Sequence, residues 1–321
     1  MNQKRTIGIL GGTGFVGHHL LPRLAARGHT LRVLTRNPYR HRDLTVLPTL
    51  ELIHADVLAP KDLRTHLDGC DTVINLVGIL NERRGRPGQT FRELHVELPR
   101  KLLDACHDLG IGRMLHMSAL NADAARGPSL YLRTKGEGEN YVLTHAGRRV
   151  QVTSFRPSVI FGPGDSFMNR FARLLRWAPG VFPLACPGAR FQPVYVGDLT
   201  DFMLETLDDP EAFGKRFDLC GPREYTLKAL VQYCARVLGL HRWILGLPDW
   251  ASRLQARILE HMPGKPFTLD NYRSLTVPSV CRRGIRMTTS LESVVPEYLT
   301  GRGGREAQLQ KLRTTRWLAQ S

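Results

Sequence analysis

A glycine-rich turn, Gly11-Gly12-Thr13-Gly14-Phe15-Val16-Gly17, is the feature that most constrains how this chain folds. It follows a short apolar run, Thr6–Leu10, and precedes a stretch of helical periodicity, His18–Arg27. A helix that begins at such a turn aims its unpaired N–H groups and its positive dipole end at one spot, which attracts a pyrophosphate. Glycine allows the tight turn, the approach of the ligand and close packing of helix on strand. The turn predicts dinucleotide binding, with a turn that only packs as the alternative.

The glycine spacing fits two patterns, and the sequence leaves both open. Gly12, Gly14 and Gly17 fit G-x-G-x-x-G, whereas Gly11, Gly14 and Gly17 fit G-x-x-G-x-x-G. Either pattern puts the last glycine where the helix packs closely on the strand.

Strand and helix patterns alternate over the first half of the chain. The run Val73–Val77 is apolar on both faces, as in a parallel sheet that helices cover on both sides. The alternation predicts an α/β fold with a doubly wound, parallel Rossmann sheet. The expected strands are Thr6–Leu10, Thr30–Thr35, Leu50–His54, Thr72–Val77, Arg113–Ser118 and Val152–Arg156, and the expected helices are His18–Arg27, Lys61–Leu67, Phe91–Leu109 and Leu130–His145.

The pattern changes after Phe161–Asp165, where proline and glycine become frequent and strands shorten. We expect a nucleotide-binding Rossmann domain over residues 1–161 and a smaller, interleaved α/β domain for substrate or partner over residues 162–321. Within the second part, Phe191–Val196 and Arg216–Leu219 resemble strands that return to the main sheet.

The net charge of +16 is unusual, whereas the apolar content of 42% and the charged content of 23% are ordinary for a globular protein. A basic surface fits an anionic membrane, an acidic protein or a solvated face. No zinc spacing, helix-turn-helix or aromatic–basic RNA signature accompanies the charge, so we expect no nucleic acid partner. The arginine clusters are Arg36–Arg42, Arg83–Arg86, Arg282–Arg286 and Arg302–Arg316.

The cysteines show no C-x-x-C pair and no short regular spacing. This argues against metal sites and disulfides and suits a reducing cytosol. No apolar run reaches the roughly 18 residues of a membrane span, and the first strand starts too early to leave room for a signal peptide. We expect a cytoplasmic protein, or one peripheral to the inner face of the membrane. The cysteines are Cys70, Cys106, Cys186, Cys220, Cys234 and Cys281.

Tyr131 and Lys135 stand four residues apart in a predicted helix and so share one face. A nearby ammonium favours the phenolate, so we expect Lys135 to lower the pKa of Tyr131. Tyr131 is then the acid or base for a substrate oxygen while a nicotinamide cofactor moves hydride, and Lys135 reaches the ribose hydroxyls. Ser118, at the end of the fifth strand, is expected to hydrogen-bond the same substrate oxygen. The alternative is that the pair lies on a solvated helix face.

The end of the second strand bears on the choice of cofactor. An NAD site normally has an acid there, about 20 residues beyond the glycine turn, to bind the ribose 2′-hydroxyl. This chain has Arg36 instead, with Arg40 and Arg42 nearby. A guanidinium suits a 2′-phosphate by bidentate, charge-assisted hydrogen bonds. The sequence favours NADP(H) over NAD(H).

Several ordered motifs resemble the extended or atypical short-chain dehydrogenases/reductases, a superfamily that is NAD-dependent epimerase/dehydratase-like. Within it the chain is most similar to the branch that includes the NADPH-binding accessory subunit of complex I and related quinone-biosynthesis proteins. The branch assignment rests on the short segment from Ser118 to Tyr131, on Arg36 and on Ser290–Pro296. The superfamily markers are Gly11–Gly17, Asp56-Val57, Asn75–Gly78, His116–Asn121, Tyr131–Lys135, Arg156–Gly164 and Pro193–Asp198.

The resemblance implies a role for further residues in holding the cofactor. The glycine turn brings Thr13, Phe15 and Val16 to the pyrophosphate. A rival interpretation of Asp56 is a surface residue that caps a helix. By the resemblance, the adenine is contacted by Asp56 and Val57. The cofactor is lined behind the ribose by Leu76, Val77 and Gly78, and the nicotinamide is bordered by Pro157, Ser158 and Val159.

Two hypotheses for function follow. The first is an NADP(H)-dependent oxidoreductase that uses Tyr131, Lys135 and Ser118 on an apolar carbonyl or quinone-related substrate. The short segment between Ser118 and Tyr131 leaves little loop to wrap a nucleotide sugar. The second hypothesis is a non-catalytic NADPH-binding accessory or scaffold subunit of a respiratory complex I or quinone-biosynthesis assembly.

The helix glycines Gly136 and Gly138 suggest that another part of the chain packs closely against the helix beside Lys135.

Two later segments combine tryptophan with arginine. In a helix that starts near Pro248, Trp250, Leu254, Ile258 and Met262 form one stripe. The segment Phe171–Leu184 has Arg173, Arg176 and Trp177 among leucines. A pocket wall or core helix is one interpretation, and a membrane-facing surface is the other.

Overall fold

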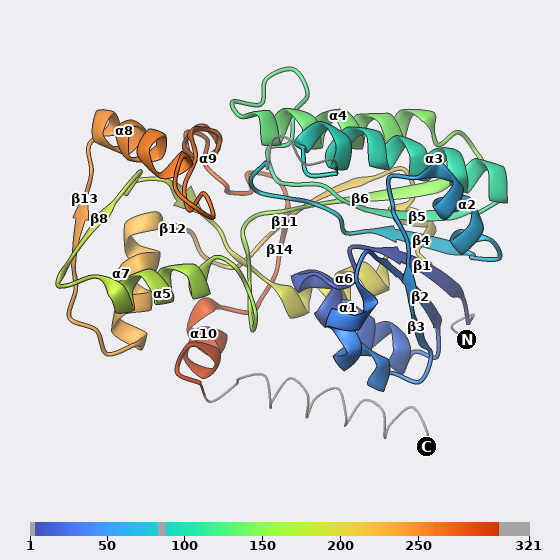
Figure 1. The fold of residues 1–321 in the computed structure, drawn as a ribbon, viewed down its shortest axis with the longest axis horizontal. Coiled ribbons are helices and arrows are strands. Elements are labelled where there is room, and N and C mark those ends of the chain that lie inside the picture. Colours follow the sequence, from blue (N-terminus) through green and yellow to red (C-terminus); the bar gives the residue numbers. More distant parts are fainter. Residues whose placement is uncertain (1–3, 83–87, 302–321) are drawn as a thin grey trace.

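The computed structural model describes residues 4–82 and 88–301, so the arginine clusters at 83–86 and 302–316 lie outside the described residues. At its centre the described chain forms an eight-stranded sheet in which all neighbouring strands run parallel (Figure 1). The strand order is β14-β11-β6-β5-β4-β1-β2-β3. Its strands are β1 (Thr6–Leu10), β2 (Thr30–Thr35), β3 (Leu50–His54), β4 (Thr72–Asn75), β5 (Arg113–Met117), β6 (Gln151–Pro157), β11 (Arg216–Cys220) and β14 (Ile285–Arg286).

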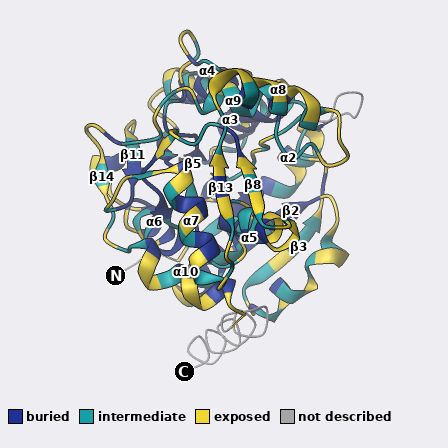
Figure 2. Cartoon of the chain, turned by 90° about the vertical axis from the view of Figure 1, so that its left-hand side faces the viewer, coloured by how far each residue is buried: buried dark blue, intermediate teal, exposed yellow. Residues whose placement is uncertain are grey.

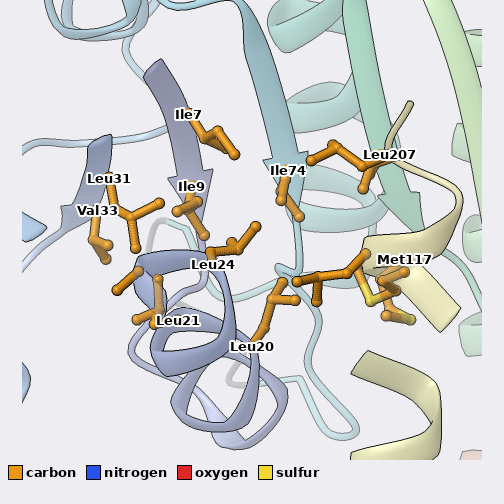
Figure 3. Packing of buried hydrophobic residues seen from close by; sticks show 14 of the residues in the cluster. Ile7, Ile9, Leu20, Leu21, Leu24, Leu31, Val33, Ile74, Met117 and Leu207 are labelled. Carbon is orange, nitrogen blue, oxygen red and sulfur yellow. The ribbon is translucent and has the colours of Figure 1, made fainter. Parts of the chain in front are cut away.

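Helices cover both faces of this sheet (Figure 1). On one face, α1 (Phe15–Ala26) and α6 (Val196–Glu205) bury leucines against β1, β2 and β4. Figure 3 shows Leu20, Leu21 and Leu24 of α1 packed on the strand residues Ile7 and Ile9. On the other face lie α2 (Pro60–Leu67), α3 (Leu98–Leu109) and α4 (Leu130–His145), which bury a second apolar cluster.

A third apolar core lies in the later half of the chain, beside the carboxyl ends of the sheet strands. It is built by α5 (Met168–Trp177), α7 (Leu227–Val237) and α10 (Leu291–Leu299). Three small sheets join it, namely β10 with β7, β12 with β9, and β13 with β8. These strands are β7 (Ile160–Phe161), β8 (Val181–Leu184), β9 (Arg190–Phe191), β10 (Val194–Tyr195), β12 (Tyr225–Thr226) and β13 (Trp243–Gly246), and α8 (Asp249–Glu260) and α9 (Leu269–Ser274) follow.

The predicted elements of the first half are present. The strands β1, β2 and β3 and the helix α4 have the predicted bounds. The predicted helix over Phe91–Leu109 contains a π-helical turn, η2 (Glu93–Glu97), directly before α3. Arg216–Cys220 does return to the sheet beside β6. The expectation for Phe191–Val196 is wrong, because β11 occupies the free edge of β6 and the segment divides into β9 and β10 in separate small sheets.

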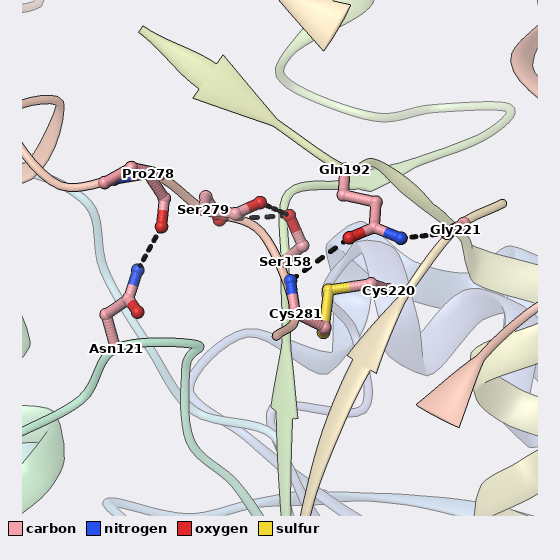
Figure 4. Close-up of a disulfide and its surroundings, with 8 residues drawn as sticks. All are labelled: Asn121, Ser158, Gln192, Cys220, Gly221, Pro278, Ser279 and Cys281. Carbon is pink, nitrogen blue, oxygen red and sulfur yellow. Dashed lines mark hydrogen bonds between the residues drawn. A yellow bond between two sulfur atoms is a disulfide. The ribbon is translucent and has the colours of Figure 1, made fainter. Parts of the chain in front are cut away.

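One cysteine pair contradicts the expectation that the chain has no disulfide. Cys220 and Cys281 form a disulfide with their Cα atoms 6.0 Å apart (Figure 4). They are 61 positions apart, and the pairing of Leu219 with Ile285 between β11 and β14 brings them together. Spacing along the sequence carries no signal for a contact that strand pairing creates. The other cysteines, Cys70, Cys106, Cys186 and Cys234, are free thiols.

The interpretation of α8 as a core helix is wrong for its apolar stripe, although Glu260 at the end of the helix does line a cavity. Trp250 is 71% exposed and Ile258 is 59% exposed, while the small residues Ser252 and Ala256 form the buried side. Trp177, at the end of α5, is also mostly exposed. Figure 2 looks onto this side of the molecule, where β8, β13 and α8 are largely coloured as exposed. Among the described residues, no helix has both the length and the hydrophobicity that a bilayer crossing requires.

Candidate active site

The glycine turn forms a tight corner between β1 and α1. Gly11 has a φ of +75°, and a Cβ added there would lie 2.9 Å from the backbone nitrogen of Val77. A Cβ on Gly17 would overlap the carbonyl oxygen of Gly12, so helix and strand pack too closely for any other residue. Gly14 is the N-cap of α1 and has no side chain to cap the helix.

The first turn of α1 is open to an anion. The N–H groups of Phe15, Val16 and Gly17 have no acceptor within the helix because they precede its first hydrogen bonds. The turn carries no acidic residue. Thr13 precedes Gly14 and is partly exposed. A cradle this close to backbone, with free donors at a helix start, fits a dinucleotide pyrophosphate.

The end of β2 presents a cation rather than a carboxylate. Arg36 is exposed, and among the described residues its guanidinium has no hydrogen bond or ion pair. Three side chains that could bind a metal lie close together: His18 on α1, and His41 and Asp43 in the segment after β2. Their nitrogen and carboxylate oxygen atoms lie within 4.8 Å of one another. The Nε2 of His18 is 3.5 Å from Asp43, and its Nδ1 is 2.9 Å from the Gly14 carbonyl. These contacts connect the start of α1 to the segment after β2.

Asp56 lies in the turn after β3 rather than at a helix cap. One of its carboxylate oxygens accepts a hydrogen bond from the backbone of Leu58, and α2 has Ala59 as its N-cap. Val57 is partly buried beside it. The rival interpretation of Asp56 as a helix cap is therefore wrong. Its contact with Leu58 stabilises the local turn.

Lys135 links the ends of β4 and β5. Its ammonium donates to the carbonyl of Met117 at 3.0 Å and to that of Val77 at 3.3 Å. A Cβ on Gly78 would lie 3.1 Å from the same nitrogen. Burial lowers the pKa of Lys135 to about 8, and the charge of Glu139 on the next turn of α4 opposes this shift.

Tyr131 lies against two rings rather than against the ammonium. The centroids of His95 and Phe91 are 5.4 Å and 5.8 Å from that of Tyr131, both edge to face. Burial raises the pKa of Tyr131 to about 12. The expectation that Lys135 lowers this pKa is wrong, because desolvation of the phenolate dominates and the ammonium is bonded to backbone carbonyls.

Ser118 carries a hydroxyl without a partner. Its backbone N–H bonds to Phe155 of β6, and the residue is only 4% exposed. The Oγ atom is buried and makes no hydrogen bond with any described residue. A buried hydroxyl is costly unless water or a ligand supplies a partner.

The segment Pro157, Ser158 and Val159 runs from the last residue of β6 onward, and a later stretch of chain covers it. The hydroxyl of Ser158 donates to the carbonyl of Ser279 at 2.8 Å, and Asn121 donates to the carbonyl of Pro278 (Figure 4). The hydroxyl of Ser158 is thus occupied, whereas that of Ser118 is not.

The structure adds two residues that sequence reasoning missed. His95 accepts the N–H of Ile79 at Nε2, and burial lowers its pKa well below the ordinary value, so the ring is neutral. Asp270 of α9 accepts the backbone N–H groups of Leu130 and Tyr131 and so holds the start of α4. Nothing in the sequence signals the contact of Asp270, because 139 positions separate it from Tyr131.

A cavity of about 310 Å³ opens between the start of α4 and the α8–α9 region. Its apolar lining comes from Phe91, Leu130 and Leu269. Polar and charged side chains line the rest, including Arg133 and Arg273. Phe91, one of the lining residues, also packs edge to face against Tyr131.

The sheet order brings these features to one edge. The strands β1, β4, β5 and β6 are consecutive neighbours, so the glycine turn, Gly78, Ser118 and Pro157 all stand at their carboxyl ends. Ligands of doubly wound sheets bind at this edge, where the strand order reverses. The glycine corner and the Tyr131–Lys135 pair, more than a hundred positions apart, therefore share a single edge.

Comparisons with known proteins agree with this fold. Residues 7–220 match the model of the NAD dependent epimerase/dehydratase family. The UDP-glucuronic acid 4-epimerase of Bacillus cereus, solved with UDP-glucuronic acid and NAD, superposes with a TM-score of 0.66 at 14% identity, over 98% of this chain and 99% of that one.

Two curated relatives are similar in sequence. Subunit 9 of the alpha subcomplex of mitochondrial NADH dehydrogenase (ubiquinone) 1 from Mus musculus is 33% identical over 263 residues, which is 77% of this chain and 66% of that protein. The chain thus spans just under two thirds of that relative's length. The ceramide reductase of Caulobacter vibrioides is 28% identical over 77% of this chain and 74% of that protein. From the matched motifs and the sheet, this chain belongs to the NAD dependent epimerase/dehydratase family.

Proposed function

We propose that this protein is an NADP(H)-dependent reductase of a carbonyl group on an apolar, lipid-like substrate. The observation that carries the proposal is the unpaired Oγ of Ser118, buried at the edge of the sheet that also holds Tyr131 and Lys135. A carbonyl oxygen of a substrate is the partner that this hydroxyl lacks. The relative named ceramide reductase supports a lipid-like substrate.

The protein's own groups supply the proton and the positioning. A bound nicotinamide nucleotide supplies the hydride, which the carbonyl carbon receives. Ser118 donates a hydrogen bond to the carbonyl oxygen, and Tyr131 gives that oxygen its proton, which solvent then restores to the phenol. Lys135 holds the ribose while its other contacts fix the ends of β4 and β5. The products are the alcohol and the oxidised nucleotide.

For the cofactor, the proposed contacts follow the strand ends in order. The corner from Gly11 to Gly17 receives the pyrophosphate, together with Thr13, Phe15 and Val16. Asp56 and Val57 contact adenine, Leu76 to Gly78 pass behind the ribose, and Pro157 to Val159 border the nicotinamide. The sheet edge that these residues share supports the assignment.

Arg36→Ala is expected to lower the affinity for NADPH by about 10- to 100-fold and to leave that for NADH nearly unchanged. The reason is that the unpaired guanidinium meets only the 2′-phosphate. Titration with each nucleotide, followed by its fluorescence, measures both. Arg27→Ala is the matched control, because Arg27 is equally exposed but lies at the far end of α1. Equal losses for the two nucleotides would refute the NADP(H) assignment.

The second candidate is a non-catalytic NADPH-binding subunit of a respiratory or quinone-biosynthesis assembly. The similarity to the mouse NADH dehydrogenase subunit favours it. So does the raised pKa of Tyr131, because a phenol that stays neutral is compatible with a structural subunit.

Oxidation of NADPH separates the two candidates. The full chain is first loaded with NADPH and then offered long-chain ketones, long-chain aldehydes, short-chain quinones and a UDP-sugar. The reductase proposal expects saturable oxidation with an apolar carbonyl and none with the UDP-sugar. Tight NADPH binding without turnover on any carbonyl would instead support the accessory subunit.

A further inference from the structure

Several large apolar side chains are exposed on one side of the molecule, which is formed by α5, β8, β13 and α8. Trp177 is 84% exposed and Trp243 is 68% exposed. The strand register places Trp243 beside Val181, and Gly180 accepts the N–H of Trp243. We call this surface the tryptophan face, defined by Trp177, Val181, Trp243, Trp250, Leu254 and Ile258.

The helix α8 continues this face rather than covering it. Its Gln255 donates to the carbonyl of Pro183 in β8, and Ser252 accepts the N–H of Cys186. The opposite side of the helix carries Trp250 and Leu254 at a spacing of four residues. In Figure 2, α8 lies above the tips of the arrows of β8 and β13.

Arginines frame the tryptophan face. Arg173 on α5 and Arg253 and Arg257 on α8 are exposed, and among the described residues their side chains have no ion pair or hydrogen bond. Both acidic residues of α8 bond elsewhere: Asp249 accepts from the Tyr272 hydroxyl, and Glu260 accepts from the N–H of Leu269. The segment Met168–Leu184 has no acidic residue.

We propose that the tryptophan face docks on the headgroup region of an anionic lipid bilayer. Tryptophan beside arginine matches that region, where the rings lie among the headgroups and the guanidinium groups meet lipid phosphates. The net charge of +16 attracts the whole chain to such a surface. A second copy of the chain is a poorer occupant, because a twofold interface would set the same arginines against each other.

The face is firmly connected to the candidate active site. Asp249 of α8 bonds to Tyr272 of α9, and Asp270 of α9 holds the N–H groups of Leu130 and Tyr131. The cavity at the start of α4 is lined in part from this same α8–α9 region. The helix α8 therefore carries part of the tryptophan face and, through Glu260, part of the cavity lining. The docking itself does not depend on the proposed reaction.

Vesicle binding tests the proposal with the full chain. Three of the four tryptophans lie on the face, and Trp317→Phe removes the remaining one from the emission signal. With phosphatidylcholine vesicles that contain phosphatidylglycerol, we expect a blue shift of the emission and quenching by brominated lipid. Binding should weaken as salt rises from about 0.05 M to about 0.5 M.

Two sets of variants locate the surface. Replacing Trp177, Trp243 and Trp250 by serine removes the emission signal, so the affinity of this variant is measured by co-sedimentation with the vesicles; it is expected to fall at least about 10-fold. Replacing Arg173, Arg253 and Arg257 by glutamine should lower it about 5-fold for each arginine. The control is Arg148→Gln with Arg149→Gln, two exposed arginines after α4, which should change little. NADPH affinity, measured on every variant, should stay within about twofold and so exclude unfolding as the cause.

Three results would overturn the proposal. The first is no binding to anionic vesicles at low salt. The second is equal binding to vesicles of pure phosphatidylcholine, which would remove the role of charge. The third is a concentration-dependent dimer that the tryptophan variants dissociate, which would assign the face to a second copy of the chain.

Discussion

Tyr131→Phe is expected to lower kcat for NADPH-linked carbonyl reduction by about 10²- to 10⁴-fold, the usual contribution of a positioned proton donor. The affinity for NADPH should change less than about twofold, because the phenyl ring keeps its contacts with His95 and Phe91. Stopped-flow oxidation of NADPH measures the rate, and a fluorescence titration measures the affinity. The loss should be in the chemical step alone.

Tyr141→Phe is the matched control for this variant. Tyr141 lies on the same helix, α4, where its ring stacks on His145 at 4.1 Å, far along the helix from Lys135. Removing its hydroxyl should leave kcat unchanged. If both variants reduce the carbonyl as fast as the parent protein, Tyr131 is not the proton donor and the catalytic assignment fails.

The raised pKa of Tyr131 also predicts how the rate in each direction depends on pH. Because burial places this pKa at about 12, the phenol keeps its proton throughout the range from about pH 6 to about pH 9 and can donate it. Reduction therefore needs no prior change of protonation at Tyr131. Oxidation of an alcohol needs the phenolate, so its rate should rise with pH over the same range. Rates of both directions against pH would show the difference.

Periodicity predicted the sheet well because the pattern is local. The apolar strands β1 to β3 and the helix α4 repeat at spacings that a short window reveals. The glycine corner was also predictable, since Gly11 and Gly17 stand where only a residue without Cβ fits. The close packing suggested by Gly138 is present too, because a Cβ there would overlap the carbonyl oxygen of His95.

What the sequence could not reveal depends on contacts between distant positions. The disulfide between Cys220 and Cys281 and the cap that Asp270 provides both arise from tertiary packing. The pKa of Tyr131 was predicted in the wrong direction for a similar reason. Sequence spacing placed Lys135 on the same helix face, but it could not show that the ammonium is bonded to the Met117 carbonyl.

Glu139→Gln is expected to lower the free energy of unfolding by about 3 to 5 kcal/mol, because it leaves the guanidinium of Arg156 without its buried counter-ion. Glu139 is fully buried, and both of its carboxylate oxygens accept from the Nε of Arg156 at 2.8 Å. The Ser154 hydroxyl donates to the same carboxylate. Urea unfolding of the parent and the variant measures the loss.

Glu137→Gln, two positions earlier on α4, separates a buried pair from an exposed one. Glu137 pairs with Arg100 at 3.0 Å, but both side chains are more than a third exposed, so its loss should cost less than about 1 kcal/mol. Equal losses of unfolding free energy for the two variants would show that burial of Glu139 adds no stability.

Glu139 also raises the pKa of Lys135 against the effect of burial. Removing the charge of Glu139 should therefore lower the pKa of Lys135 below about 8. If NADPH binding needs the charged form of Lys135, the affinity of the variant should begin to fall at a lower pH than that of the parent protein.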